Sequence, residues 1–242
     1  MRSPEPRFAR IAALIADPSR ARMLALLLSG EARSAGELAR AVSITPQTAS
    51  THLAQLLDAG LIKLRAQGRH RYFTLADADV AHMLEALSFV AERDQVRTRW
   101  DTPAYKPLKY ARTCYCHLAG ELGVQQHDAL IANRVLIHDE HGAMTLGDNA
   151  AAWLREAQFT DHAIDALRRD TSKQRFAYGC MDWSMRRDHL AGVFATRLLT
   201  HYLAQGWLRK TATARALEPT PPGVAVLSRL LAVAASARKT PT

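Results

Sequence analysis

Apolar residues between positions 34 and 60 recur at helical spacing in two short runs. The first run is Leu38, Ala41 and Val42, and the second is Ala49, Leu53, Leu56 and Leu57. Ser34 and Glu37 have the spacing of a capping box before the first run. Thr45 followed by Pro46 supplies a hydroxyl cap and a proline at the first helical position of the second run, which Gly60 ends. This pattern predicts two short helices joined by a turn.

Two further apolar stretches alternate with polar residues and predict a β-hairpin. The outgoing strand contains Leu61, Ile62 and Leu64, and the returning strand contains Tyr72, Phe73 and Leu75. Gln67 and Gly68 form the predicted turn. Helix, turn, helix and hairpin in this order predict a winged helix-turn-helix, whose second helix reads the major groove of DNA.

Candidate DNA-binding side chains lie on the second helix and on the hairpin. The helix face opposite the apolar stripe carries short hydrogen-bonding groups that suit base edges. These are Thr45, Gln47, Thr48, Ser50, Thr51 and His52. The hairpin carries side chains that suit phosphate contacts, namely Arg65, Arg69, His70 and Arg71. The alternative is a solvated basic hairpin beside a helix pair that has no contact with DNA.

Several short motifs in residues 7–95 resemble the ArsR/SmtB family of bacterial repressors. They are Asp17-Pro18-Ser19-Arg20, Ser50-Thr51-His52-Leu53, Gly60-Leu61-Ile62 and Gly68-Arg69-His70-Arg71-Tyr72. The resemblance implies a homodimeric, operator-binding repressor that leaves DNA when its inducer binds. It also implies a dimer interface built from the first and last helices of this module, for which residues 8–15 and 80–90 carry apolar stripes. Intramolecular core is the alternative for both stripes.

The metal sites best known in that family are absent at the matching positions. Residues 34–38 hold no thiol, and Asp79 and His82 are followed by no second histidine on their helix. Any sensing must therefore lie further along the chain. For Arg20, in the second helix of the module, the sequence leaves two alternatives open: its side chain contacts a DNA phosphate, or it is solvated.

Composition limits the class of protein without choosing its function. The chain has 242 residues, 48% of them hydrophobic, and a formal net charge of +9, which favours nucleic acid or an anionic surface as partner. The most apolar stretch, residues 224–237, is interrupted by Ser228 and Arg229 and is too short to span a membrane. Three cysteines do not suit a disulfide framework, so we expect a cytoplasmic protein with reduced thiols.

The length and a change of composition predict two domains. We expect a DNA-binding and dimerisation domain at residues 1–95, a linker rich in proline, basic and aromatic residues at 96–113, and an effector or assembly domain at 114–242. In the last of these, residues 117–120 recur as residues 189–192, and apolar positions keep matching at the same offset. We therefore expect a mainly α protein with small β-hairpin wings, whose C-terminal α+β domain consists of two winged-helix-like repeats.

Candidate sensor residues stand at the head of each repeat. They are Cys114, Cys116, His117, Cys180 and His189. If the two copies pack together, Cys114, Cys116 and Cys180 could hold a thiophilic metal ion or form a redox switch. Buried core is the alternative for each, since cysteine is among the most buried residue types. A pocket lined by Trp153, Trp183, Tyr202 and Trp207 is a second candidate for an inducer site, and simple core is again the alternative.

The patterns predict a DNA-binding protein, not an enzyme, and the family resemblance implies a dimeric repressor that is released from its operator by an inducer, which we expect to bind in the C-terminal domain. No Gly-rich nucleotide loop, zinc-protease helix or nucleophile elbow occurs in the sequence. The alternative functions are an enzyme joined to a DNA-binding module, with Cys180 and His189 as nucleophile and base, and a scaffold whose duplicated domain only assembles oligomers.

Overall fold

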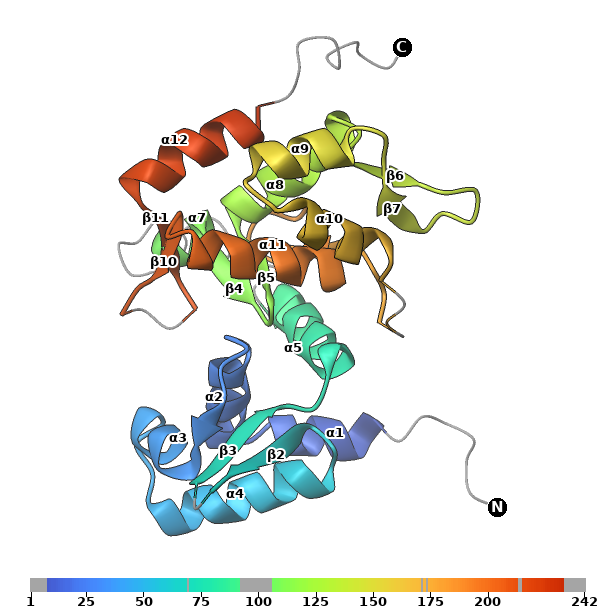
Figure 1. Ribbon diagram of the computed structural model, residues 1–242. Helices are drawn as coiled ribbons and strands as arrows, with labels where there is room; N and C mark the ends of the chain where they lie inside the picture. Colours follow the sequence, from blue (N-terminus) through green and yellow to red (C-terminus); the bar gives the residue numbers. More distant parts are fainter. Residues whose placement is uncertain are drawn as a thin grey trace. The chain divides into compact units, whose positions relative to one another are not determined.

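The chain forms two compact units, and each is described by itself. The computed structural model describes residues 8–68, 70–91, 106–170, 172, 174–212 and 215–232. Contacts divide it into Met1–Glu85 and Ala86–Thr242 (Figure 1). The division lies inside the helix that the sequence places at the end of the first domain, before residue 95.

The first unit is the predicted winged helix-turn-helix. Its elements are α1 (Phe8–Ile15), α2 (Pro18–Leu27), β1 (Arg33–Ser34), α3 (Ala35–Ala41), α4 (Pro46–Asp58), β2 (Ile62–Gln67), β3 (His70–Leu75) and α5 (Ala78–Ala91), the last of which crosses the division. β3 pairs antiparallel with both β1 and β2, giving the strand order β1-β3-β2. The wing is therefore attached to the segment that leads into α3.

Side-chain caps start three of these helices where the sequence predicts them. Asp17 accepts the backbone N–H of Arg20 at the start of α2, and Thr45 accepts that of Thr48 at the start of α4. Ser34 and Glu37 form both bonds of the capping box of α3. Because each cap satisfies a backbone donor that the helix leaves open, the helix boundaries follow from local sequence.

The second unit contains short hairpins and helices that occur in the same order twice. After α7 (Lys106–Tyr110), the first copy consists of β4 (Arg112–Cys114), β5 (His117–Ala119), α8 (Glu121–Ala132), β6 (Leu136–His138), β7 (Met144–Leu146) and α9 (Ala150–Glu156). α10 (Asp161–Arg168) follows. The second copy consists of β8 (Tyr178–Met181), β9 (Asp188–Ala191), α11 (Val193–Ala204), β10 (Leu208–Lys210), β11 (Leu217–Pro219) and α12 (Pro221–Leu230). Describing each copy as winged-helix-like stays a prediction.

The long helix of each copy packs against the hairpin of the other copy as well as against its own. Helix α8 of the first copy contacts β9 of the second, and α11 of the second contacts β5 of the first. Figure 1 shows the hairpins β6–β7 and β10–β11 on opposite sides of these helices. Most of the matched apolar positions, among them Leu130 with Tyr202 and Leu136 with Leu208, are buried in one core, whereas Ala204 is exposed. The copies therefore share a single hydrophobic core.

The structure bears on two sequence expectations about this unit. Within the predicted linker, residues 106–110 form α7, and Arg112, fully buried, begins β4. Of the two interpretations left open for the aromatic residues, the structure supports core for Trp153, Tyr202 and Trp207. Trp183 instead lies under the guanidinium of Arg112, 4.4 Å from its ring centre.

None of the helices in the described part of the chain is long and apolar enough to cross a lipid bilayer.

Gly192 combines a positive φ with a close backbone neighbour, so an added side chain there should destabilise the repeat. We expect Gly192→Ala to lower the free energy of unfolding by about 2–3 kcal/mol. Its φ of 99° suits glycine, and a Cβ there would stand 2.6 Å from the carbonyl oxygen of Phe176. Gly206→Ala is the matched control, because its φ is also positive at 66° while a Cβ would meet nothing, so that about 1 kcal/mol is expected. Urea unfolding followed by circular dichroism compares them, and equal losses would contradict the packing argument.

Candidate functional site

Helix α4 presents a continuous polar face to solvent. Its apolar residues Ala49, Leu53 and Leu56 are buried against the rest of the unit. The candidate base-reading residues on the other side are exposed, namely Thr45, Gln47, Thr48, Ser50 and Thr51. The amphipathic pattern therefore leaves these five side chains available to a ligand as large as a DNA groove.

Two hydroxyl groups on this face already donate to helix carbonyls, whereas those of Thr45 and Thr48 bond to each other. Ser50 Oγ donates to the carbonyl of Pro46 at 2.9 Å, and Thr51 Oγ1 donates to that of Gln47 at 3.3 Å. Such bonds use the hydroxyl hydrogen and leave oxygen lone pairs facing outward. Ser50 and Thr51 are thus oriented to accept hydrogen bonds, for example from the exocyclic amines of bases.

His52, the sixth candidate on α4, has a different environment. Its ring is half-buried, with Nδ1 3.1 Å from the guanidinium of Arg20 and Nε2 3.8 Å from a carboxylate oxygen of Asp17. Arg20 also donates to Gln55 at 2.9 Å and to the carbonyl of Leu14 at 2.7 Å. These contacts join α1, α2 and α4, so the structure resolves the open role of Arg20 as a link between helices.

The wing carries exposed cations on both strands. Arg65 stands opposite Tyr72 in the β2–β3 register, and Arg71 stands opposite Ala66. Arg65, His70 and Arg71 are all exposed, whereas Arg69 lies outside the described residues. The described part of the wing therefore offers positive charge to solvent beside the polar face of the module.

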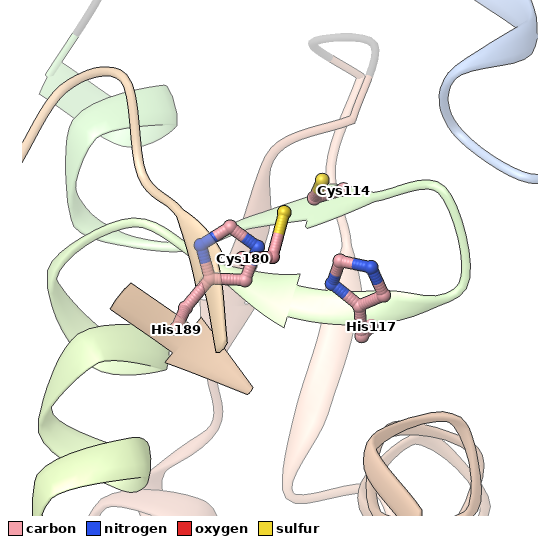
Figure 2. Close-up of side chains that lie close together, drawn as sticks. All are labelled: Cys114, His117, Cys180 and His189. Carbon is pink, nitrogen blue, oxygen red and sulfur yellow. The ribbon is translucent and has the colours of Figure 1, made fainter. Parts of the chain in front are cut away.

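The second unit brings four of the five candidate sensor residues together. Cys114, His117, Cys180 and His189 point toward one another from two hairpins (Figure 2), and one ligand atom of each lies within 4.8 Å of all the others. All four are buried, with exposed fractions from 0% to 8%. Convergence of Cys114 with Cys180, which the sequence leaves open, is thus a property of the fold.

Cys116 is the exception, and the predicted Cys114/Cys116/Cys180 metal triad is corrected on this point. Cys114 and His117 are direct partners across the β4–β5 hairpin, so their side chains share one face. Cys116 lies in the turn between them and is only partly buried. The two histidines belong to the cluster and Cys116 does not, because strand pairing sets each histidine opposite a cysteine.

Each hairpin supplies the same pair of residues. Cys180 and His189 are direct register partners in β8–β9, just as Cys114 and His117 are in β4–β5. Residues 181–188 separate the second pair, but only residues 115–116 separate the first. A search at one fixed offset therefore aligns the histidines and misaligns the cysteines, and an alignment with a gap in this loop would have paired both.

The buried carboxylate of Asp182 lies next to the cluster and contacts His189. Asp182 accepts hydrogen bonds from Arg112 at 2.9 Å and from the backbone N–H of Gly120 at 2.7 Å. Its second oxygen accepts from the hydroxyl of Ser184 at 2.7 Å, and His189 Nδ1 lies 3.3 Å from the carboxylate. Sequence reasoning missed Arg112, because no periodic pattern marks an arginine as fully buried.

This network shifts both titratable groups at its centre. Burial alone would raise the pKa of Asp182, but His189, Arg112 and Ser184 hold it well below the usual range. Burial alone would lower the pKa of His189, but the carboxylate of Asp182 and the sulfur of Cys180 raise it to about 9. A ligand that binds the imidazole must therefore displace a proton.

A cleft in the second unit is the alternative place for a small organic molecule. It has a volume of about 410 Å³, and its lining includes Phe159, Arg197 and His201. The imidazole of His201 stacks on Phe159 with ring centres 3.9 Å apart, and one of its nitrogens lies 2.7 Å from the carbonyl of Ala157. A flat, partly apolar ligand with a negative group would suit this lining.

An exposed polar recognition helix beside a basic wing defines the class as a winged helix-turn-helix, DNA-binding transcription regulator. A family model described as a helix-turn-helix domain matches residues 15–65. The uncharacterised HTH-type transcriptional regulator YdfF of Bacillus subtilis is 37% identical over 218 residues, which cover 90% of this chain and 94% of YdfF. The chain therefore belongs to the family of HTH-type transcriptional regulators that includes YdfF.

Other relatives match only the first part of the chain. The HTH-type transcriptional regulator CmtR of Mycobacterium bovis is 36% identical over 83 residues, covering 34% of this chain and 70% of CmtR. A homodimeric winged helix-turn-helix domain of Mb0332, a possible ArsR-family regulator from Mycobacterium bovis, is 28% identical, with a TM-score of 0.34, covering 39% of this chain and 93% of that one. The relatives are named as transcriptional regulators, and YdfF extends the similarity into the second unit.

The Arg112–Asp182 pair should contribute strongly to stability. We expect Asp182→Ala to lower the free energy of unfolding by about 3–5 kcal/mol, because it leaves the fully buried Arg112 without its counter-charge. Glu218→Ala is the matched control, since it breaks the exposed pair with Arg209 and should cost less than about 1 kcal/mol. Urea denaturation of both variants measures the difference, and a small loss for Asp182→Ala would contradict the network described above.

Proposed function

We propose that this regulator is a homodimeric repressor that leaves its operator when an inducer occupies the C-terminal unit. The exposed polar face of α4 is the observation that carries the DNA-binding part of the proposal. In this proposal α4 enters the major groove, and Thr45, Gln47, Thr48, Ser50 and Thr51 approach base edges or adjacent phosphates. The roles of the individual side chains follow from their chemistry.

Gln47 is the side chain best suited to read a base directly. It is exposed on the first turn of α4, and a glutamine amide can bond adenine through both its oxygen and its nitrogen. His52 is better suited to holding α4 in position, because it already contacts Arg20 and Asp17. Arg65, Arg69, His70 and Arg71 bind phosphate, which fixes register and adds affinity without sequence preference.

Dimerisation is supported by apolar side chains that one chain leaves in solvent. Helix α1 is strongly apolar but has no buried residue, and Phe8 is 69% exposed. On α5, Leu87 and Val90 are also exposed. Apolar faces of this kind are usually covered by another surface, and a second copy of α1 and α5 is the partner that the family resemblance implies.

The second unit is proposed to sense the inducer. Its cluster of Cys114, His117, Cys180 and His189 suits a thiophilic metal ion, and the cleft beside His201 suits an organic ligand. An enzymatic role for Cys180 and His189 is disfavoured, because His189 is fully buried and a substrate could not reach it. A scaffold without a ligand would leave DNA binding independent of any small molecule.

Specific binding is tested by fluorescence anisotropy of the reduced protein on a duplex from its own upstream region, at fixed salt and with nonspecific competitor. We expect Gln47→Ala to lose about 1–3 kcal/mol of operator preference, since it removes a base contact. Arg71→Ala should weaken binding to all duplexes alike and reduce the salt slope by about 1.

Arg168→Ala is the matched control for charge, because it removes one exposed arginine from α10 in the other unit. It should leave operator preference and the salt slope unchanged. The repressor proposal fails if the wild-type protein shows no preference for any upstream duplex, or if Arg71→Ala and Arg168→Ala behave alike.

The dimer is tested by light scattering coupled to size-exclusion chromatography. We expect the wild-type chain to have twice its mass of 26.8 kDa. Phe8→Glu should weaken association by about 10-fold or more, because a carboxylate would have to enter an apolar interface. Met181→Glu changes an equally apolar but separate surface residue, 48% exposed in the second unit, and should remain dimeric. A monomeric wild-type chain would overturn this part of the proposal.

A further inference from the structure

We propose that the second unit binds one Zn(II)-class ion between its two copies, with Cys114, His117, Cys180 and His189 as its four ligands. The inference names the effector chemistry of the unit to which the proposed function assigns sensing, and its regulatory meaning rests on that proposal. The site itself is argued from the second unit alone. By Zn(II)-class we mean a borderline-soft divalent ion that prefers tetrahedral coordination by sulfur and nitrogen.

The backbone arranges the four ligands in two equivalent pairs. Cys114 faces His117 across β4–β5, and Cys180 faces His189 across β8–β9. Strands β5 and β9 contact each other, which brings the two pairs together. Figure 2 shows the four side chains converging on one region. An ion bound there would join segments that are far apart in the sequence and belong to different copies.

The spacing fits tetrahedral coordination after a small contraction. The four ligand atoms lie within 4.8 Å of one another. Zinc bonds of about 2.3 Å to sulfur and about 2.0 Å to nitrogen require ligand atoms roughly 3.3–3.8 Å apart. Movements of about 1 Å, within the range of side-chain rotation, therefore convert the observed arrangement into a complete coordination sphere.

The donor set and the burial select the class of ion. Two thiolates and two neutral imidazoles favour Zn(II) over the hard ions Mg(II) and Ca(II), which take oxygen ligands. Two thiolate charges neutralise a divalent ion, as a fully buried site requires. All four positions would be filled by protein, so the site is closed. Closed sites of this kind order a fold and do not present a reactive metal-bound water.

Asp182 provides the second-sphere support that metal-bound histidines usually have. Its carboxylate lies 3.3 Å from His189 Nδ1 and is held in place by Arg112 and Gly120. Nε2 of His189 is buried as well. A carboxylate that accepts Nδ1–H leaves Nε2 for the metal and fixes the ring orientation. Asp182 is thus a positioning residue.

The test uses the full-length chain, reduced, freed of metal with a chelator and titrated with Co(II) and then Zn(II). We expect one Co(II) per chain, with the intense visible absorption of tetrahedral cobalt and a thiolate charge-transfer band, and stoichiometric displacement by Zn(II). Elemental analysis of the untreated protein gives an independent count. DNA is absent from the assay, so failure of the repressor proposal would leave its outcome unaffected.

Variants assign the ligands. Cys114→Ser, Cys180→Ser and His189→Gln should each lose the tetrahedral spectrum and weaken metal binding by at least 100-fold. Cys116→Ser is the matched control and should keep both, because Cys116 lies outside the cluster. His189→Cys preserves four ligands and should restore cobalt binding with a stronger thiolate band. That rescue distinguishes a lost ligand from a variant that fails to fold.

Three results would overturn the proposal. They are an octahedral cobalt spectrum, binding that survives Cys180→Ser with the spectrum unchanged, and the absence of stoichiometric binding by the reduced wild-type chain.

Discussion

The buried carboxylate of Asp182 is the constraint on which the second unit depends. An uncompensated charge in the interior costs several kcal/mol, so its partners have to be brought to it. Arg112 and the N–H of Gly120 come from the first copy of the repeat, whereas Asp182, Ser184 and His189 come from the second. Satisfying one carboxylate therefore fixes how the copies meet, and that meeting sets Cys114 and His117 against Cys180 and His189.

The first unit is held by a different kind of interaction. Its helices begin at Asp17, Ser34 and Thr45, where a side chain caps the backbone within one turn, and their apolar faces pack on a small core. The longer-range polar contacts of Arg20 join helices α1, α2 and α4. Local rules therefore suffice to leave the polar face of α4 exposed, which is the basis of its assignment to DNA.

Duplication gives the second unit its chemistry. One hairpin carrying a cysteine opposite a histidine offers only two ligands, too few for a closed site. Two such hairpins placed face to face offer four, buried between the copies. Binding sites in proteins often lie between repeated halves, since each half can then move or become ordered as one unit when the ligand binds. A regulator could use this arrangement to connect ligand binding with the order of the whole unit.

By itself, the sequence determined the helix-turn-helix, its wing and its caps, because each depends on residues a few positions apart. It also revealed the repeat, since Leu130 with Tyr202 and Leu136 with Leu208 match at one offset and are buried together. Only the tertiary structure decided that Arg112 is interior, that Cys116 lies outside the cluster, and that Cys114 meets Cys180. These outcomes depend on strand register and on the length of the loop at residues 181–188, which hydrophobic periodicity does not encode.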